Sequence, residues 1–375
     1  MKIEVLREKL NQAISIVSRV AIKSPNLPIL EGIMIKADDN SVHFSATDLE
    51  IGVEVTALAK VAKDGQAVVP GRIISALGRL MSDEKLYIEL IKNTLNVKDA
   101  ENETSLQIME SEDFPIIPKP ESSLTVEISG SALNEGLRQV IGCVAPSRTR
   151  PEISGVYMHF KDDQLILAAT DSYRLAQKTI SLSQKLKKDY EIILPAKAVN
   201  NIIGILGESN SSVKITGDDN QIEFLTVLGE APSNLEIRMV SRLIEGTYPK
   251  YQEVIPDKSP ITIKIDRQEF LSKIKAASLL SDQTYEVRLT VSSEENNLKI
   301  KAQSSRVGEF KSSISAEITG GDMEIAFNGR FLSDALTNIN GASAYLCLTD
   351  ADKAALIKQD GQEDYLHVLM PIRSN

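Results

Sequence analysis

Two acidic residues stand in the same short motif far apart in the chain. Ala-Thr-Asp ends an apolar run at Asp48 and again at Asp171. Two carboxylates that folding brings together can act as general acid and general base, so the pair could mark an enzyme. The motif could instead mark corresponding turns of a duplicated domain, because Thr and Asp side chains accept hydrogen bonds from the backbone N–H groups of a turn. The elements around the motif must decide between these interpretations.

Other residues suited to catalysis or metal binding are few. His43, His159 and His367 each stand alone in strand-like sequence, and Cys143 and Cys347 lack the CxxC spacing of a zinc site or redox motif. The sequence contains no GxGxxG, GxxxxGK[ST], HExxH or GxSxG motif. We therefore predict no catalytic residue, no metal site and no cofactor.

The composition is that of an ordinary globular protein. The chain has 375 residues, of which 42% are hydrophobic and 25% charged, enough for two or three domains. No apolar run reaches the length of a membrane span, and the N-terminus shows no signal-peptide pattern. Two isolated cysteines suit a reducing compartment, so we expect a cytoplasmic protein. The net charge of −10 excludes a uniformly basic protein, but phosphate binding needs only local positive charge.

Three segments of the chain repeat the same series of elements. Each opens with a short alternating strand and an amphipathic helix, and each places a second helix directly after a later strand. The opening strands are predicted at 2–5, 125–128 and 262–265, and the second helices start near Pro70, Pro195 and Asn328. We call the segments 1–120, 121–256 and 257–375 repeats 1, 2 and 3, and expect one domain from each. The predicted fold class is α+β, with two helices and antiparallel sheets in every domain.

An apolar stripe on the first helix of each repeat predicts its buried face. The stripes comprise Leu10, Ile14 and Val17 in repeat 1, Leu133, Leu137, Val140 and Ile141 in repeat 2, and Phe270, Leu271, Ile274 and Ala277 in repeat 3. Asp266 occupies an N-cap position with Glu269 three residues later, as in a capping box. The strands after these helices are predicted from Leu27, Arg150 and Thr284.

The sequence of repeat 3 at the corresponding position helps to decide the role of the two aspartates. It has Gln303-Ser304-Ser305 where the other repeats have Thr-Asp. An acid needed for catalysis could be lost from one copy, so this difference alone leaves the enzyme hypothesis open. A turn-forming role explains all three sequences, and we favour it for Asp48.

The ordered stretches LPILEGIMI, ATDLEIGVE, RPEISGVY, ATDSYRLA, LIEGTYPKYQEVIP and VLMPIR are together distinctive. They resemble the β sliding clamps, the processivity subunits of bacterial DNA polymerase III, and the resemblance runs from Met1 to Arg373. It implies that three domains form half of a closed ring, and that two chains join head to tail as a homodimer that encircles double-stranded DNA. It also implies binding to the DNA polymerase III catalytic subunit, the clamp loader and other proteins that carry clamp-binding peptides.

The resemblance further implies that helices line the central hole, so basic residues on and beside them become DNA-binding candidates. Arg72, Lys197 and Arg330 stand at matching positions, two residues beyond the start of each second helix. The Lys23–Ser24 turn and the Ser147–Arg150 loop match family positions that touch duplex DNA. The full candidate set is Lys23, Ser24, Arg72, Arg79, Arg138, Arg148, Arg150, Lys197 and Arg330.

A peptide-docking groove between domains 2 and 3 is the second site that the resemblance implies. Its matching positions are Ile153, Thr170, Leu175, Pro249, Val254, Val368, Met370 and Pro371, with Arg174 and Arg373 at the rim and 350–357 as a further wall. An apolar floor of this kind binds side chains modestly, and Met adapts to varied partners. This sequence departs from familiar members at Ser172-Tyr173, where they have Gly-His, and in its polar C-terminal residues.

The family's dimer contact matches Leu279 and Leu280, which would face an edge strand near Leu106 and Ile108 in a second copy. Two alternatives to a clamp stay open at this point. One is an enzyme that uses Asp48 or Asp171, and the other is a repeat-built protein-interaction scaffold that does not encircle DNA.

Overall fold

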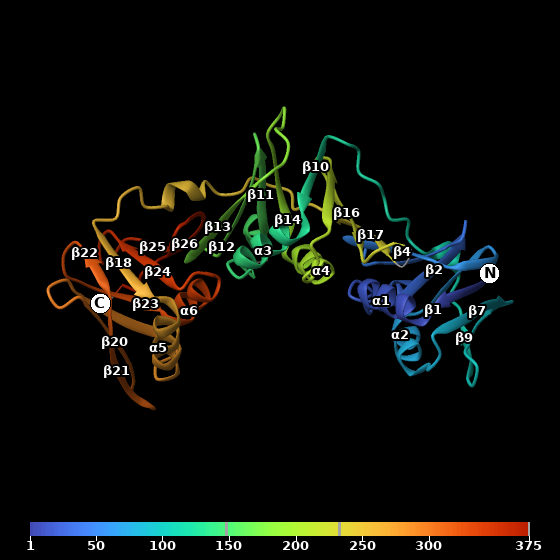
Figure 1. The fold of residues 1–375 in the computed structure, drawn as a ribbon, viewed down its shortest axis with the longest axis horizontal. Helices are drawn as coiled ribbons and strands as arrows, with labels where there is room; N and C mark the ends of the chain where they lie inside the picture. The colour runs from blue at the N-terminus through green and yellow to red at the C-terminus, as the bar shows by residue number, and fades with distance from the viewer. Residues whose placement is uncertain (147–148, 232–233, 374–375) are drawn as a thin grey trace. The chain divides into compact units, whose positions relative to one another are not determined.

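The computed structural model describes residues 1–146, 149–231 and 234–373. The chain divides into two compact units, both built from antiparallel sheets and helices (Figure 1). Unit 1 comprises Met1–Asn134, Leu182–Gln184 and Lys197–Ile244, and unit 2 comprises Glu135–Ser181, Lys185–Ala196 and Glu245–Asn375. The fold class is α+β, as predicted.

Unit 1 contains a five-stranded and an eight-stranded sheet. The five-stranded order is β5 (Lys60–Lys63), β1 (Lys2–Leu6), β7 (Lys85–Ile91), β8 (Thr94–Lys98), β9 (Glu103–Gln107). The eight-stranded order is β10 (Leu124–Ser129), β15 (Ser212–Gly217), β16 (Gln221–Leu228), β17 (Leu235–Arg242), β4 (Ile51–Leu58), β3 (Ser41–Thr47), β2 (Gly32–Asp38), β6 (Gly65–Pro70). Because β17 belongs to repeat 2 and β4 to repeat 1, two repeats share one sheet through this strand pair.

Unit 2 contains a nine-stranded and a four-stranded sheet. The nine-stranded order is β14 (Tyr190–Pro195), β11 (Gly155–Lys161), β12 (Gln164–Thr170), β13 (Arg174–Ser181), β26 (Gln362–Leu369), β25 (Ala355–Gln359), β24 (Ser343–Leu348), β18 (Ile261–Asp266), β22 (Glu317–Thr319). The four-stranded order is β21 (Gly308–Ser315), β20 (Asn297–Ser304), β19 (Glu286–Ser292), β23 (Met323–Asn328). The pair β13 and β26 joins repeats 2 and 3 as β4 and β17 join repeats 1 and 2.

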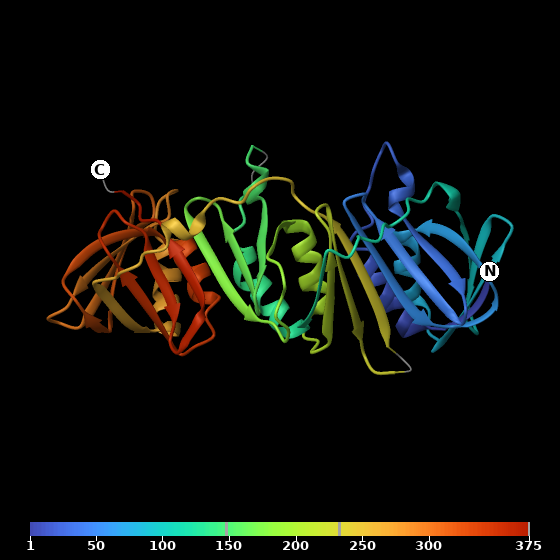
Figure 2. The same cartoon turned by 90° about the horizontal axis from the view of Figure 1, so that it is seen from above.

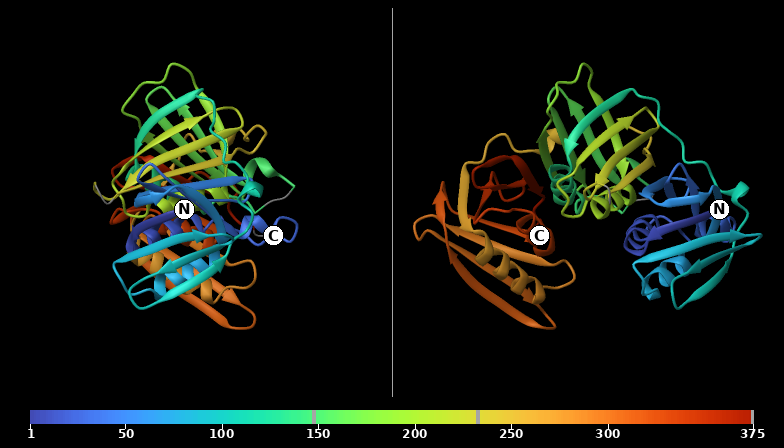
Figure 3. Two further views of the ribbon diagram at one scale, coloured as in Figure 1. Left: turned by 90° about the vertical axis from the view of Figure 1, so that its right-hand side faces the viewer. Right: turned by 45° about the vertical axis from the view of Figure 1, so that its right-hand side comes forward.

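Each repeat contributes two helices, as the sequence predicts. They are α1 (Arg7–Val17) and α2 (Gly71–Leu80), α3 (Gly130–Ile141) and α4 (Ala196–Leu206), and α5 (Arg267–Leu279) and α6 (Gly329–Thr337). Within unit 1, α1 packs against α2, and within unit 2, α5 packs against α6. Figure 2 shows the strands of unit 1 with helices behind them, and the right panel of Figure 3 shows α5 against the face of the four-stranded sheet.

The predicted apolar stripes are buried, and they explain why these segments form helices at these places. Side chains three and four residues apart share one helix face, which packs on the sheets. All the stripe residues named above are buried except Ile141, which is half-buried at the end of α3. Asp266 caps α5 as predicted, since its side chain accepts a hydrogen bond from the Glu269 backbone N–H at 2.8 Å.

Elements that contain a proline begin at slightly different residues than predicted. The strands expected from Leu27 and Arg150 begin only at Gly32 and Gly155, after the short 3-10 helices η1 (Pro28–Glu31) and η3 (Pro151–Ile153). Proline has a fixed φ and no N–H group, so Pro28 and Pro151 suit a turn better than a sheet ladder. Pro70 is the N-cap of α2 rather than its first residue.

The Ala-Thr-Asp motif forms a turn, as favoured above. Asp48 accepts hydrogen bonds from the N–H groups of Glu50 and Ile51, at 3.0 and 2.7 Å. Asp171 accepts two in the same way, from Tyr173 and Arg174, both at 3.0 Å. The two carboxylates therefore hold corresponding turns that lead into β4 and β13.

Repeat 3 makes the equivalent turn with a serine. Ser304 Oγ accepts hydrogen bonds from the N–H groups of Arg306 and Val307, both at 3.3 Å. In the other repeats the corresponding hydroxyls, of Thr47 and Thr170, accept from the residue two positions later. This turn leads into β21, so β4, β13 and β21 are equivalent strands.

The described residues contain neither a membrane-spanning helix nor a cluster of metal ligands. Over the described ranges, no helix is both long enough and apolar enough to cross a bilayer. Within the same ranges, no group of three or more His, Cys, Asp or Glu side chains is arranged to hold a metal ion.

Candidate nucleic-acid interface and docking site

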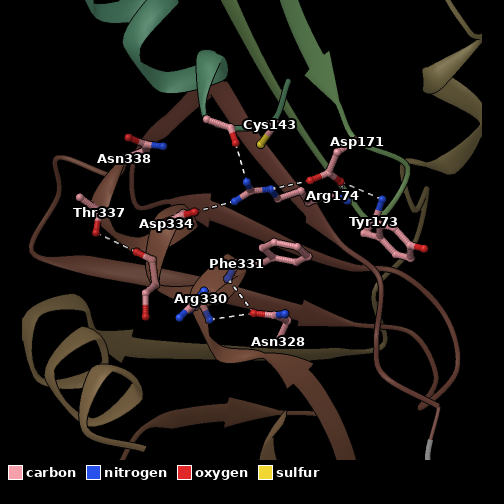
Figure 4. Close-up of polar contacts among 12 residues, drawn as sticks. Cys143, Asp171, Tyr173, Arg174, Asn328, Arg330, Phe331, Asp334, Thr337 and Asn338 are labelled. Atoms are coloured by element: carbon pink, nitrogen blue, oxygen red, sulfur yellow. Dashed lines mark hydrogen bonds and ion pairs between the residues drawn. The ribbon is translucent and has the colours of Figure 1, made fainter. Parts of the chain in front are cut away.

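Arg174 lies at the centre of a polar network in unit 2 (Figure 4). Its guanidinium donates hydrogen bonds to Asp171 at 3.0 Å, to Asp334 on α6 at 2.6 Å and to the Gly142 carbonyl oxygen at 2.6 Å. The same group lies over the Phe331 ring, 4.3 Å from its centroid. Two carboxylates, a carbonyl and an aromatic face thus hold one cation.

This network corrects the role predicted for Arg174. Its side chain is only 12% exposed, so the guanidinium does not lie at an open rim. It instead ties the turn before β13 in repeat 2 to α6 in repeat 3, and so positions the surface above it. Tyr173, which is exposed, and Phe331 join this region although the sequence argument did not select them. In the sequence, these two residues could have been selected only because Tyr173 is next to Arg174 and Phe331 is three residues after Asn328.

The structure brings several predicted groove residues together beside this network. Leu175 and Val368 are opposite each other in the β13–β26 pair, and both are buried. The chain then leaves β26, and the Met370 N–H donates to the Tyr173 carbonyl oxygen at 2.9 Å. The Met370 side chain is exposed, and Thr170 and Pro371 are half-buried. The result is an apolar surface with a buried floor and one exposed, flexible thioether.

The remaining groove candidates lie on two nearby segments of unit 2. Ile153 is buried, Pro249 is half-buried and Val254 is exposed. Arg373 is exposed and lines a cavity of about 500 Å³ with Ala351 and Asp352. Part of the expected wall at 350–357 therefore lies beside the C-terminal segment.

Three predicted DNA-binding residues meet in one cavity of unit 1. Lys23, Arg72 and Arg79 line a space of about 410 Å³ beside α2. Glu31 is the one acidic residue in the lining, so the local charge is positive although the chain as a whole is acidic. Three cations around an open cavity suit a phosphate group, which is bound through charge without reading sequence.

The three repeat-matched cations differ in their surroundings. Arg72 is exposed in the basic cavity. Lys197, in contrast, forms an ion pair with the buried carboxylate of Asp48. Arg330 lies over the Tyr285 ring, 3.4 Å from its centroid. Equivalent positions therefore do not have equivalent freedom to bind phosphate.

The other DNA-binding candidates are scattered. Arg138 is exposed on α3, and Ser24 Oγ accepts a hydrogen bond from the Leu27 N–H at 3.2 Å. Arg150 pairs with Glu152 at 3.2 Å and donates to Ser172 at 3.0 Å. The predicted residues Ser147 and Arg148 lie outside the described residues.

The residues predicted at the dimer contact are only partly exposed. Leu279 at the end of α5 is 80% exposed, and Leu280 and Ile108 are half-buried. Leu106 is buried, which corrects its expected exposure, because it lies opposite Leu95 on the buried face of its sheet. β9 is still an edge strand, so it offers backbone groups. Leu80 on α2, 78% exposed, was not predicted.

A buried histidine lies beneath the docking surface. His367 on β26 is 3.2 Å from the Tyr365 hydroxyl and 3.8 Å from the Cys143 sulfur. Burial, with a smaller effect of Arg174, lowers the pKa of His367 to about 3. Burial also raises the pKa of the Cys143 thiol to about 12, so this cluster is neutral near pH 7. It is a packing element and not a nucleophilic site.

Comparisons with known proteins agree with this architecture. Models of the N-terminal, central and C-terminal domains of the DNA polymerase III beta subunit match residues 1–118, 127–250 and 252–373. The beta sliding clamp of Synechococcus elongatus is 26% identical over 379 residues, covering 100% of this chain and 99% of that protein. The beta sliding clamp of Bacillus subtilis is 26% identical over 386 residues, covering 100% of both.

Solved structures of sliding clamps show the same fold over the full length. One from Pseudomonas aeruginosa bound to griselimycin has a TM-score of 0.94 at 25% identity, covering 100% of both chains. One from Bartonella birtlesii bound to griselimycin has a TM-score of 0.92 at 28% identity, with the same coverage.

Three α+β repeats that share sheets across their junctions define the DNA-clamp class of proteins. Within that class, the chain belongs to the DNA polymerase III beta subunit family, whose members are the bacterial sliding clamps of DNA replication.

The buried histidine predicts a pH dependence of stability. An unfolded histidine titrates near 6.5, so between about pH 6.5 and 3 the unfolded chain binds a proton that folded His367 excludes. Stability from this site is complete above pH 6.5 and falls as pH drops, by about 1.4 kcal/mol per unit. In urea unfolding, His367→Gln should lose less stability than wild type between pH 7 and 5. His43→Gln, which removes a half-buried histidine from another sheet, is the control, and equal losses in all three proteins would contradict the assignment.

Proposed function

We propose that two copies of this chain close head to tail into a ring that encircles double-stranded DNA and tethers the replicative polymerase and other proteins to it. In this proposal the chain is a cytoplasmic processivity factor and not an enzyme. The observation that carries this proposal is that β9 and β21 are edge strands, each unpaired on its outer side among the described strands. Repeats 1–120, 121–256 and 257–375 are the proposed domains, and the three matched family segments support them.

The strand pairs that join repeats within the chain predict which strands would pair with β9 and β21. β4 pairs with β17 and β13 pairs with β26, in each case an equivalent strand of one repeat with the last strand of the next. β21 is the equivalent strand of repeat 3, and β9 is the last strand of repeat 1. Neither has a partner on its outer side among the strands of the described ranges. The same antiparallel pairing between β21 and β9 of a second copy would satisfy both edges.

Helix contacts support the same closure. In unit 2 the first helix of repeat 2 contacts the end of the second helix of repeat 3, since Gln139 donates to the Asn338 carbonyl oxygen at 2.9 Å. By this rule α5 of repeat 3 should meet α2 of another copy. Leu279 on α5 and Leu80 and Ile73 on α2 are exposed apolar side chains that such a contact would bury. A head-to-tail contact joins different surfaces of the two copies. It gives a closed ring when the rotation that relates the copies returns to the first one.

The basic cavity supports weak contact with the DNA backbone. Lys23, Arg72 and Arg79 would bind phosphate without base recognition, which is compatible with sliding. Retention would depend on the closed ring and not on affinity. Ion pairing of Lys197 with Asp48 limits its contribution, so attraction stays modest.

The apolar surface around Leu175, Val368 and Met370 is the proposed docking groove for clamp-binding peptides. Its buried floor is held by the Arg174 network, and Met370 can adapt to different partners. The griselimycin complexes of two relatives show that sliding clamps of this fold hold ligands. Candidate partners are the DNA polymerase III catalytic subunit and the clamp loader.

An interaction scaffold that never encircles DNA is the alternative function. A ring slides off linear DNA ends but stays on a closed circle, whereas a scaffold binds both forms alike. The turn roles of Asp48 and Asp171 and their pairing with cations argue against the enzyme hypothesis.

The seam prediction concerns Leu279. Leu279→Glu should convert dimers to monomers at micromolar concentration, because the exposed leucine would otherwise be buried against α2 of the other copy. Sedimentation velocity measures the change. Leu58→Glu, at an exposed leucine in β4, is the matched control and should stay dimeric. Adding Leu80→Lys to Leu279→Glu should restore part of the dimer, because the two new charges are opposite. If Leu279→Glu alone stays dimeric, the proposed seam is wrong.

The DNA prediction separates Arg72 from Lys197. On linear duplex DNA, Arg72→Ala should reduce the slope of log affinity against log salt by about 0.9, the value for one lost phosphate contact. Lys197→Gln should leave the slope unchanged, because its ammonium already pairs with Asp48. Fluorescence anisotropy at a series of salt concentrations measures both. A larger effect of Lys197→Gln would show that the ion pair opens on DNA.

The groove prediction concerns Met370. Met370→Lys should weaken binding of a fluorescein-labelled clamp-binding peptide from the cognate polymerase about tenfold, because it places a charge on the apolar surface. Anisotropy measures the affinity, and sedimentation should show an unchanged dimer. Leu58→Lys is the control at a comparably exposed apolar residue. Unaltered affinity in Met370→Lys would locate the peptide elsewhere.

A further inference from the structure

The segment from Met109 to Pro118, which we call the strap, crosses one face of the repeat 1 sheet. Its first end is fixed where the Met109 N–H donates to the Val68 carbonyl oxygen at 2.8 Å, and Gln66 donates to Ser111 at 3.2 Å. Its last end is fixed by Arg238, which donates to the Pro118 carbonyl oxygen. The strap is therefore held at both ends.

A cavity of about 520 Å³ lies between the strap and the sheet, within the size range of ligand pockets. Strand residues form its floor, and the strap forms one wall. The lining includes Met34, His43, Glu54, Glu112, Phe114 and Ile116. Ile116 is 92% exposed, an unusual position for an isoleucine in a segment anchored on both sides.

The equivalent place in repeat 2 is filled. Gly32 pairs with Pro70 as Gly155 pairs with Pro195, so Met34 in β2 corresponds to Tyr157 in β11. The Tyr157 ring stacks on Tyr248 at 4.9 Å and contacts Tyr251 at 5.9 Å between ring centroids. Those two tyrosines come from the segment that connects repeats 2 and 3. The strap of repeat 1 carries Phe114 but no tyrosine, and the space beside it is open.

The cavity also has unbalanced charge. Glu54 and Glu112 form no salt bridge with any residue of the described ranges. Arg238, the cross-strand neighbour of Glu54, is bound to Glu223 at 2.6 Å and to the strap. Lys36 also lines the cavity. Its hydrogen bond to Asp38 at 2.7 Å and, more weakly, the charge of Glu54 raise the pKa of Lys36, so two glutamates face one lysine in the lining.

We propose that this cavity is a second docking site, which binds an extended peptide of a client protein carrying a Lys or Arg beside an apolar side chain. The basic group pairs with Glu54 and Glu112, and the apolar side chain packs on Ile116, Phe114 and Met34. The site is in unit 1 and is separate from the groove of Leu175 and Met370. It depends neither on ring closure nor on DNA binding, so its failure would leave the proposed function intact.

The experiment uses the full-length protein and two fluorescein-labelled probes, Gly-Leu-Arg-Leu-Gly and Gly-Leu-Glu-Leu-Gly. Wild type should bind the arginine probe more tightly. The double variant Glu54→Gln/Glu112→Gln should lose about fivefold affinity for that probe and lose the preference, as two partly exposed ion pairs would give. Ile116→Ser should weaken both probes. The control Glu208→Gln/Glu230→Gln removes two exposed carboxylates elsewhere in unit 1 and should behave as wild type.

Three outcomes would overturn the proposal. Equal binding of both probes by wild type would show that the glutamates do not select charge. Loss of the arginine probe in Met370→Lys, with Glu54→Gln/Glu112→Gln unaffected, would place the probe in the docking groove. A change in the dimerisation of Glu54→Gln/Glu112→Gln by sedimentation, without change in probe affinity, would make this face a contact between copies of the chain.

Discussion

Backbone hydrogen bonding between strands of neighbouring repeats is the constraint on which the molecule depends. A strand at a sheet edge presents unpaired N–H and C=O groups, and this chain satisfies two such edges internally through β4–β17 and β13–β26. The same rule leaves β9 and β21 without partners on their outer sides among the described strands. A monomer therefore has two edges of the kind that its own interior always pairs. The dimer closure proposed above would pair both edges without a new type of contact.

The turn that begins each equivalent strand strengthens these junctions in different ways. Asp48 pairs with Lys197 on the second helix of repeat 2, and Asp171 reaches Asp334 on the second helix of repeat 3 through Arg174. In both cases the carboxylate also holds its own turn, so turn geometry and junction geometry are coupled. Repeat 3 uses Ser304 in place of an aspartate within the turn, and the Ser304 hydroxyl donates to the Asp282 carboxylate at 2.7 Å. Its junction would form between copies and would depend more on strand pairing and on Leu279.

Sequence reasoning succeeded where the information is local. The apolar stripe of α1 and the Asp266 cap follow from spacing alone, and the turn role of Asp48 follows from the residue types that a turn needs. It failed where a side chain's surroundings come from distant segments. Arg174 is held by Gly142 and Asp334, and Leu106 lies opposite Leu95 on the buried face of its sheet. Neither fact is encoded in the residues beside them.

Repeats that share a fold need not share their surfaces, and the two connecting segments show why. The segment after repeat 2 carries Tyr248 and Tyr251, whose rings close the space above Tyr157. The strap after repeat 1 faces Met34, and the same sheet face keeps an open cavity lined by Glu54 and Glu112. Filling that space with rings would stabilise the sheet through apolar burial. An open, charged cavity at an otherwise equivalent place gives up that stability, which argues that the space is used for binding.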